Sequence, residues 1–170
     1  MPLIEKGEIV EDSFVRVHDD EALPEGAPVL LGLDRFLKEA EALQGRQAPI
    51  GLIWPNNRPI AEIAPYLDRI ALIALNFPSF RDGRAYSQAR LLRERLGWTG
   101  ALRAIGNVLR DQFLLMERSG FDQIEAVKTA DAEAFDEAVQ AYTVFYQPAT
   151  DARPSLLRQR LGRTLPGVRS

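Results

Sequence analysis

The sequence predicts an α/β protein with a mostly parallel sheet of about five strand–helix units, preceded by a small N-terminal β-hairpin. Short apolar runs of strand length alternate with longer segments whose apolar residues recur at helical spacing. This alternation is typical of parallel sheets whose strands are joined by helices. A doubly wound sheet and an incomplete βα-barrel both fit. Both place functional loops at the carboxyl ends of the strands.

The first 28 residues lie before this alternation begins. Leu3-Ile4 and Ile9-Val10 flank a Lys6-Gly7 turn, and apolar residues recur as far as residue 17. This pattern predicts a β-hairpin or meander over residues 2–17. Residues 18–28 are acidic and contain two prolines and a glycine, so we expect a loop there.

Five apolar runs follow, each with the length of a buried strand. We expect strands at residues 29–31, 50–54, 70–75, 101–105 and 121–127. The third strand ends before Pro78, because proline lacks the N–H donor that a sheet ladder needs.

Each run is followed by a segment with helical periodicity. We expect helices at residues 34–43, 59–67, 85–96, 108–119 and 131–145. Gly45, Gly97 and Gly120 are expected to stop the first, third and fourth helices. Asn107 is expected to be the N-cap of the fourth, and Pro65 disturbs the end of the second.

The chain has 170 residues, enough for one domain with its own core. We expect a single α/β domain over residues 1–147 and a basic C-terminal arm over residues 148–170, which contain three prolines and five arginines. No apolar run reaches the roughly 18 residues of a membrane helix. Residues 1–6 lack the pattern of a signal peptide. We therefore expect a cytoplasmic protein without membrane contacts.

Cysteine is absent, and His18 is the only histidine. These facts exclude disulfides, thiolate metal sites, a cysteine nucleophile and cysteine-bound iron–sulfur clusters. A two-histidine metal site within one chain is also excluded, and we predict no metal site. His18 lies in an acidic stretch and is expected at the surface.

The net charge of −3 is unevenly distributed. Residues 81–120 hold eight arginines and four acidic residues, whereas residues 1–80 hold 7 basic and 13 acidic residues. Of the 21 basic residues, 18 are arginine, the residue best suited to bidentate contacts with anions. A negative net charge and the lack of a recognition motif argue against nucleic-acid binding.

Polar residues follow the third and fourth predicted strands, where the next helices begin. The free amides of a helix N-terminus attract anions, and arginines beside them suit a small oxyanion or phosphate group. We expect the anion-binding residues to be Arg81, Asp82, Gly83, Arg84, Tyr86, Ser87, Arg90, Arg103, Asn107, Arg110 and Asp111. Gly83 permits a backbone angle that other residues resist. The alternative is structural: Asp82 and Asp111 would neutralise these arginines, and Glu94 could pair with Arg90.

Common catalytic motifs are missing. The sequence contains no G-x-G-x-x-G fingerprint, no P-loop and no G-x-S-x-G elbow. Tyr86 precedes Arg90 by four residues, but arginine is always protonated and cannot act as the lysine of a Tyr-x-x-x-Lys pair. No catalytic residue and no cofactor can be named from these residues.

Three segments resemble the bacterial family known as domain of unknown function 934: FPSFRDGRAYSQARLLR at 77–93, LRAIGNVLRDQ at 102–112 and SGFD at 119–122. The likeness covers roughly residues 27–147. Members are labelled oxidoreductases involved in sulfite reduction, so the resemblance implies a pathway and no established catalytic residues. Asn76 and Asn107 stand where the family more often has aspartate.

The resemblance and the arginine cluster lead to three hypotheses. The first is an accessory protein of sulfite reduction and sulfate assimilation that binds a small anion. The second is a non-catalytic partner that docks on sulfite reductase or another sulfate-assimilation enzyme through complementary charge. The third is an oxidoreductase with a non-covalently bound cofactor. A homodimer is also expected, because a short open sheet leaves apolar surface.

Overall fold

A computed structural model describes residues 2–79 and 81–126, whose strands form one sheet. The strands are β1 (Leu3–Glu5), β2 (Glu8–Val10), β3 (Val15–Arg16), β4 (Val29–Gly32), β5 (Ile50–Trp54), β6 (Leu72–Phe77), β7 (Ala101–Gly106) and β8 (Gln123–Glu125). Their spatial order is β2-β1-β8-β7-β6-β5-β4-β3. The class is therefore α/β with a mostly parallel sheet.

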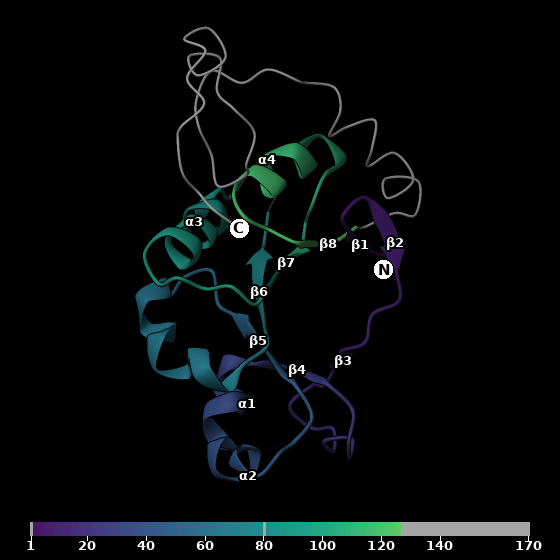
Figure 1. Ribbon diagram of the computed structural model, residues 1–170, viewed down its shortest axis with the longest axis vertical. Helices are drawn as coiled ribbons and strands as arrows, with labels where there is room; N and C mark the ends of the chain where they lie inside the picture. Colours follow the sequence, from purple (N-terminus) through teal and green to yellow (C-terminus); the bar gives the residue numbers. More distant parts are fainter. Residues whose placement is uncertain (1, 80, 127–170) are drawn as a thin grey trace, which may run out of the picture.

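Strands β3 to β8 are parallel, and each pairs with the next one along the chain. The hairpin β1–β2 adds an antiparallel edge through β8. The sheet curls into half a barrel (Figure 1). A doubly wound sheet requires a point at which the strand order reverses. The order of the described strands from β3 to β8 has no such point. Of the two predicted arrangements, the described residues form the incomplete barrel.

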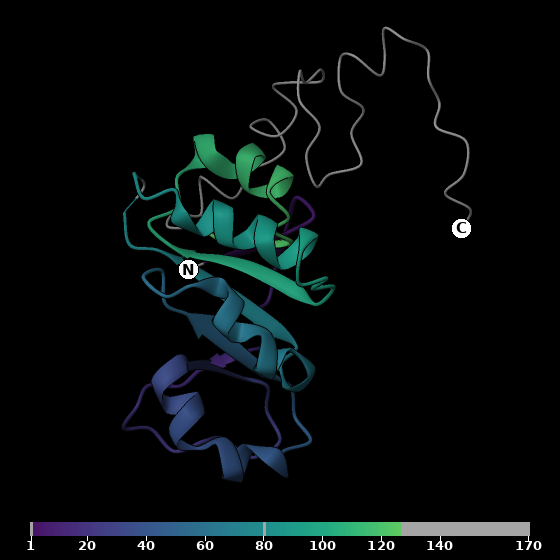
Figure 2. The same cartoon turned by 90° about the vertical axis from the view of Figure 1, so that its left-hand side faces the viewer.

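The helical segments cover one face of the sheet (Figure 2). They are α1 (Leu33–Lys38), α2 (Ala40–Gln44), the 3-10 helix η1 (Ile60–Arg69), α3 (Arg84–Glu94), the 3-10 turn η2 (Arg110–Gln112) and α4 (Phe113–Arg118). Phe36, Leu92 and Met116 from these helices are fully buried against the strands, and these contacts form the main core.

The opposite, concave face carries a smaller core. Leu30, Leu72, Ala74 and Ile105 are buried there, with Phe14 packed on them. Phe14 belongs to residues 11–16, which lead from the end of β2 through β3 on this side (Figure 1). We call residues 11–16 the crossing segment. Gly51 makes room for it, because a Cβ at Gly51 would lie 2.9 Å from Leu30 and 3.3 Å from Phe14.

Several elements differ from the sequence prediction. The predicted helix 34–43 is interrupted at Glu39, whose ψ of 15° separates α1 from α2. The predicted helix 59–67 is the 3-10 helix η1, which contains Pro65. The predicted helix 108–119 is replaced by η2 and α4. The strand predicted at 70–75 lies at Leu72–Phe77.

The N-terminal hairpin is confirmed, and the Lys6-Gly7 turn has positive φ at both residues. Val15 and Arg16 leave the hairpin and form β3 beside β4. The predicted helix 131–145 and the arm 148–170 lie outside the described residues. Within the described part of the chain, no helix is long and apolar enough to cross a membrane.

Candidate functional site

Parallel strands end at the same edge of a sheet, so the loops after β5, β6 and β7 lie together at the carboxyl edge. In βα-barrels this edge carries the functional groups. The loop after β6 begins where Pro78 ends the ladder, and the amide of Asp82 donates to the Ser79 carbonyl at 2.9 Å. This turn places Asp82 directly before α3.

Asp82 and Arg84 form the central ion pair of this loop. The Asp82 carboxylate accepts hydrogen bonds from Nε of Arg84 at 2.9 Å and from Nη2 at 2.6 Å. The Arg84 side chain is 59% exposed. Because Asp82 occupies the Nε–Nη2 side of the guanidinium, the Nη1–Nη2 edge remains open toward solvent.

Electrostatics keep this pair charged. The hydrogen bond from Arg84 lowers the pKa of Asp82 to about 2, and a side-chain hydrogen bond from Asn56 acts in the same direction. The same contact raises the pKa of Arg84. Asp82 is therefore a carboxylate throughout the neutral range, and it orients Arg84.

The loop after β7 is tied to the loop after β6. The Asn107 side chain donates to the Pro78 carbonyl at 2.8 Å, and its amide donates to the Phe77 carbonyl at 2.8 Å. Gly106 has a φ of +94°, and a Cβ there would lie 2.6 Å from the Phe77 carbonyl oxygen. Asn107 thus joins two loops, and the prediction that it caps a helix is wrong.

Tyr86 lies below these loops. Its ring packs edge-on against Phe77, with centroids 5.0 Å apart, and against Phe121 at 6.5 Å. Its hydroxyl oxygen is buried and has no hydrogen-bond partner among residues 2–79 and 81–126. Burial, helped by the charge of Asp111, raises the pKa of Tyr86 to about 12. Tyr86 is therefore neutral and contributes mainly packing.

Arg103 does not lie at this site, which corrects the prediction. It occupies the middle of β7, paired with Ala74 of β6, and points to the concave face, where its side chain is only 1% exposed. Asp12 of the crossing segment binds its two terminal nitrogens at 2.7 and 2.8 Å. Gln123 accepts from its Nε at 2.9 Å.

Other predicted site residues are also accounted for. Arg90 is exposed on α3 and pairs with Glu94 at 3.3 Å, and Ser87 is exposed. Gly83 has a φ of −82°, so it does not use the freedom that glycine permits. Arg81, Arg110 and Asp111 are exposed in the loops after β6 and β7. The two loops, η2 and the start of α3 carry Arg81, Asp82, Gly83, Arg84, Tyr86, Asn107, Arg110 and Asp111.

Two buried amides that the sequence prediction missed support this edge. Asn56, after β5, donates to the Asn76 carbonyl at 3.0 Å. Gln88 of α3 donates to the Arg58 carbonyl at 3.1 Å. Both side chains are less than a tenth exposed. A single Asn or Gln has no characteristic spacing, so no sequence signal pointed to them.

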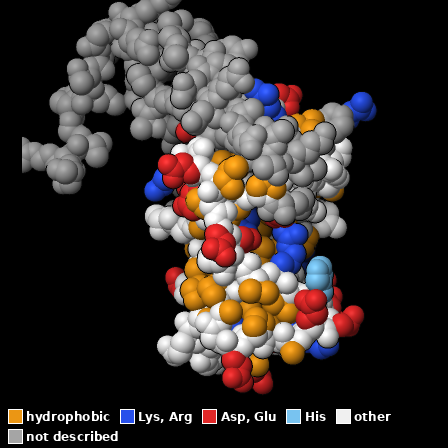
Figure 3. Space-filling view, turned by 90° about the vertical axis from the view of Figure 1, so that its right-hand side faces the viewer, with side chains coloured by type: hydrophobic (Ala, Val, Ile, Leu, Met, Phe, Trp, Pro, Cys, Tyr) orange, Lys and Arg blue, Asp and Glu red, His pale blue; other side chains and the backbone are white. Residues whose placement is uncertain are grey.

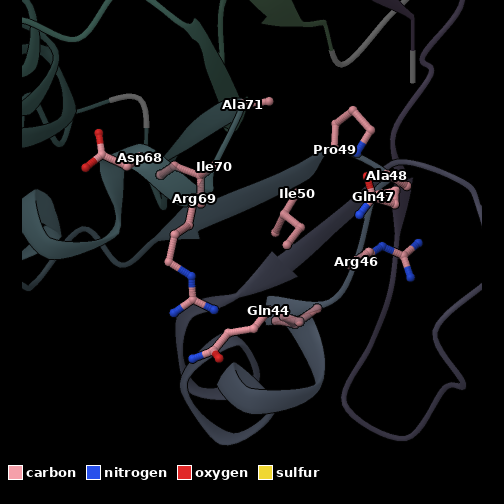
Figure 4. A pocket seen from close by; sticks show the side chains of 11 residues that line it. Gln44, Arg46, Gln47, Ala48, Pro49, Ile50, Asp68, Arg69, Ile70 and Ala71 are labelled. Atoms are coloured by element: carbon pink, nitrogen blue, oxygen red, sulfur yellow. The ribbon is translucent and has the colours of Figure 1, made fainter.

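A cavity of about 450 Å³ lies at the opposite, amino edge of the sheet (Figure 4). Its two arginines serve the scaffold. Arg46 donates to the carbonyls of Pro24 and Ala27. Arg69 donates to the Ala40 carbonyl at 2.8 Å and packs on the Phe36 ring. In βα-barrels this edge serves stability, so the carboxyl edge remains the candidate site.

Among residues 2–79 and 81–126, no group of three or more histidine and acidic side chains is arranged to hold a metal ion. What the carboxyl edge offers is hydrogen-bond donors and a guanidinium oriented by Asp82, which suit an anionic group.

Comparison with known families matches residues 51–157 to one described as "Bacterial protein of unknown function (DUF934)". The matched segment begins at the second residue of β5 and includes β6, β7, β8 and the loop that carries Asp82 and Arg84. A comparison with curated proteins found no match. Since the match spans more than half of the 170 residues, the chain belongs to this bacterial family of unknown function.

Proposed function

We propose that the protein is an accessory protein of sulfite reduction and sulfate assimilation that binds a small oxyanion at its carboxyl edge. Arg84 is the principal ligand of the anion in this proposal. The observation that carries it is the Asp82–Arg84 pair, in which a carboxylate holds two nitrogens of a largely exposed guanidinium.

The geometry supports this role in two steps. Asp82 removes rotational freedom from Arg84 before any ligand arrives, and preorganisation of this kind lowers the entropic cost of binding. The Nη1–Nη2 edge can then donate two parallel hydrogen bonds to one oxyanion. The two loops and the start of α3 carry Arg81, Arg84 and Arg110 against Asp82 and Asp111, a small excess of positive charge that favours a negative guest.

The pathway is inferred from the resemblance of residues 77–93 to proteins labelled for sulfite reduction. Sulfite and sulfate are small oxyanions, and their size and charge fit one oriented guanidinium with flanking polar groups. No catalytic step is assigned to the chain.

Calorimetric titration of the full chain with sulfite, sulfate and phosphate tests the proposal. We expect binding at millimolar concentration or tighter, weakened about tenfold in Arg84→Gln, which removes a charge-assisted contact. Arg90→Gln is the matched control, because Arg90 is 57% exposed and also pairs with a carboxylate. Absence of binding, or equal losses in both variants, contradicts the proposal.

A second candidate role, docking on sulfite reductase or another sulfate-assimilation enzyme, is favoured by one observation. β2 ends the sheet of the described residues, and its Ile9 is 50% exposed. An open edge strand with an apolar side chain can pair with a partner. Ile9→Lys should then reduce co-purification of the reductase. Val15→Lys on the other edge strand should not, and equal effects would count against this role.

A further inference from the structure

A cleft lies on the concave face of the sheet, at the carboxyl ends of β4 to β7. Two adjoining cavities of about 290 and 270 Å³ form it, and both are lined by Asp19, Gly32, Ile53 and Asn76. The sheet register brings these positions together, because Gly32 pairs with Ile53 and Asn76 pairs with Ile105. We call it the concave cleft.

Three polar side chains of the concave cleft are available to a ligand. The side chains of His18, Asp19 and Asn76 make no hydrogen bond or ion pair with any other described residue. Ile53 and Ile105 contribute an apolar lining. Ligand sites typically combine an apolar surface with a few convergent polar groups.

The loop that carries His18 and Asp19 is fixed in place. Arg35 of α1, only 5% exposed, donates to the carbonyls of His18 and Glu21. The His18 amide also donates to the Glu21 carboxylate at 2.8 Å. The buried Arg35 therefore fixes the backbone of this loop, while the side chains of His18 and Asp19 make no hydrogen bond to other described residues.

Charge is polarised along the concave cleft. Arg16 and His18 line only the first cavity, Asp34 and Arg35 line only the second, and Asp19 lines both. The Arg35 guanidinium already donates to the Glu39 carboxylate and to two backbone carbonyls, so Asp19 and Asp34 supply the free charge of the second cavity. Arg16 uses Nη2 for Glu125 at 2.8 Å and keeps other donors. Figure 3 shows this side of the molecule, with acidic and basic side chains close together beside hydrophobic ones.

We infer that the concave cleft binds a small zwitterion of amino-acid size. Its anionic group would lie at Arg16 and His18, and its ammonium group at Asp19 and Asp34. The Asn76 amide bonds the middle of the ligand, and the short aliphatic part covers Ile53. The site differs from that of Arg84, because the cleft is on the concave face and the Arg84 loop leads into a helix on the other face.

The test is NMR titration of the full chain with taurine and β-alanine, each of which carries both charges. Ethanesulfonate, propionate and propylamine are the matched probes with one charge. We expect the zwitterions to bind about tenfold more tightly, as the loss of one charged contact predicts. Shifts should appear at residues 16–19, 32, 53 and 76.

Asp19→Asn provides the variant, and Asp20→Asn, exposed on the same turn, the matched control. Asp19→Asn should weaken taurine binding about tenfold and leave sulfite binding at Arg84 unchanged, whereas Asp20→Asn should change neither. Three results would overturn the inference: no shift at 20 mM (about the weakest affinity expected), equal binding of the singly charged probes, or equal effects of the two variants.

Discussion

Removal of Asp12 should destabilise the protein by about 1.5–3 kcal/mol. Arg103 is 1% exposed, and in Asp12→Ala both of its terminal nitrogens lose the carboxylate. Each hydrogen bond to a charged group contributes about 1.5–3 kcal/mol. The Asp12 side chain is 39% exposed, so in Asp12→Ala water can take over part of the hydrogen bonding to Arg103. We therefore take roughly half of the summed free energy of the two hydrogen bonds.

Urea denaturation at neutral pH measures this loss. Glu94→Ala is the control, because it breaks the exposed Arg90–Glu94 pair and should cost less than about 0.5 kcal/mol. Arg103→Met combined with Asp12→Ala should restore part of the stability, since no unpaired charge is then buried. If Asp12→Ala costs no more than Glu94→Ala, the Arg103–Asp12 pair does not anchor the crossing segment.

The stability lost in Asp12→Ala should depend on pH in one direction. Burial alone would raise the pKa of Asp12, but the Arg103 hydrogen bond and charge, the Phe14 amide and the Arg16 charge together outweigh burial and lower it. A carboxyl whose pKa is lower in the folded state stabilises that state above its unfolded pKa. The difference between wild type and Asp12→Ala should therefore shrink as the pH falls through the lowered pKa.

Three further predictions concern the carboxyl edge. Tyr86→Phe should leave stability unchanged or raise it by up to about 1 kcal/mol, because the lost hydroxyl has no partner in the described part of the chain. The pKa of Tyr86 is about 12 in the folded chain, so above about pH 10 the unfolded chain loses this proton while the folded chain keeps it. Wild-type stability should therefore fall above about pH 10, and it should fall less in Tyr86→Phe. Equal alkaline unfolding of both proteins would refute this. Arg84→Gln should raise the pKa of Asp82 from about 2 toward its ordinary value, measured by NMR titration of its carboxyl carbon, and an unchanged value would show that Arg84 does not hold it. Gly106→Ala should cost about 1–3 kcal/mol in urea, because a positive φ and a close carbonyl both oppose a Cβ. Gly97 also has a positive φ but has open space around its Cβ position, so Gly97→Ala should cost about 1 kcal/mol. Equal losses in the two variants would show that the Phe77 carbonyl beside Gly106 adds no cost.

The sequence predicted the strands and α3 well because their signals are local. The apolar run of β5 and the start of α3 after Asp82-Gly83 can each be read within a few residues. The break at Glu39 could not be predicted, since no proline or glycine marks it. The two-residue strand β3 pairs with β4 only through tertiary structure.

The candidate site was predicted in part. The loop with Asp82 and Arg84 was located correctly, because proline and glycine punctuate the chain there. The placement of Arg103 failed for a physical reason: β7 is buried on both faces, so its sequence gives no alternation that separates them. Its partner Asp12 is 91 residues away, and no local pattern connects the two.

We propose that the loops after β6 and β7 bind a small oxyanion through Arg84. Backbone-amide NMR of the full chain titrated with sulfite tests it most directly, because the shifts locate the ligand. We predict shifts concentrated at residues 79–84 and 106–111 that are lost in Arg84→Gln and retained in Arg90→Gln. Sulfite-induced shifts confined to other parts of the chain, or none at saturating sulfite, would contradict it.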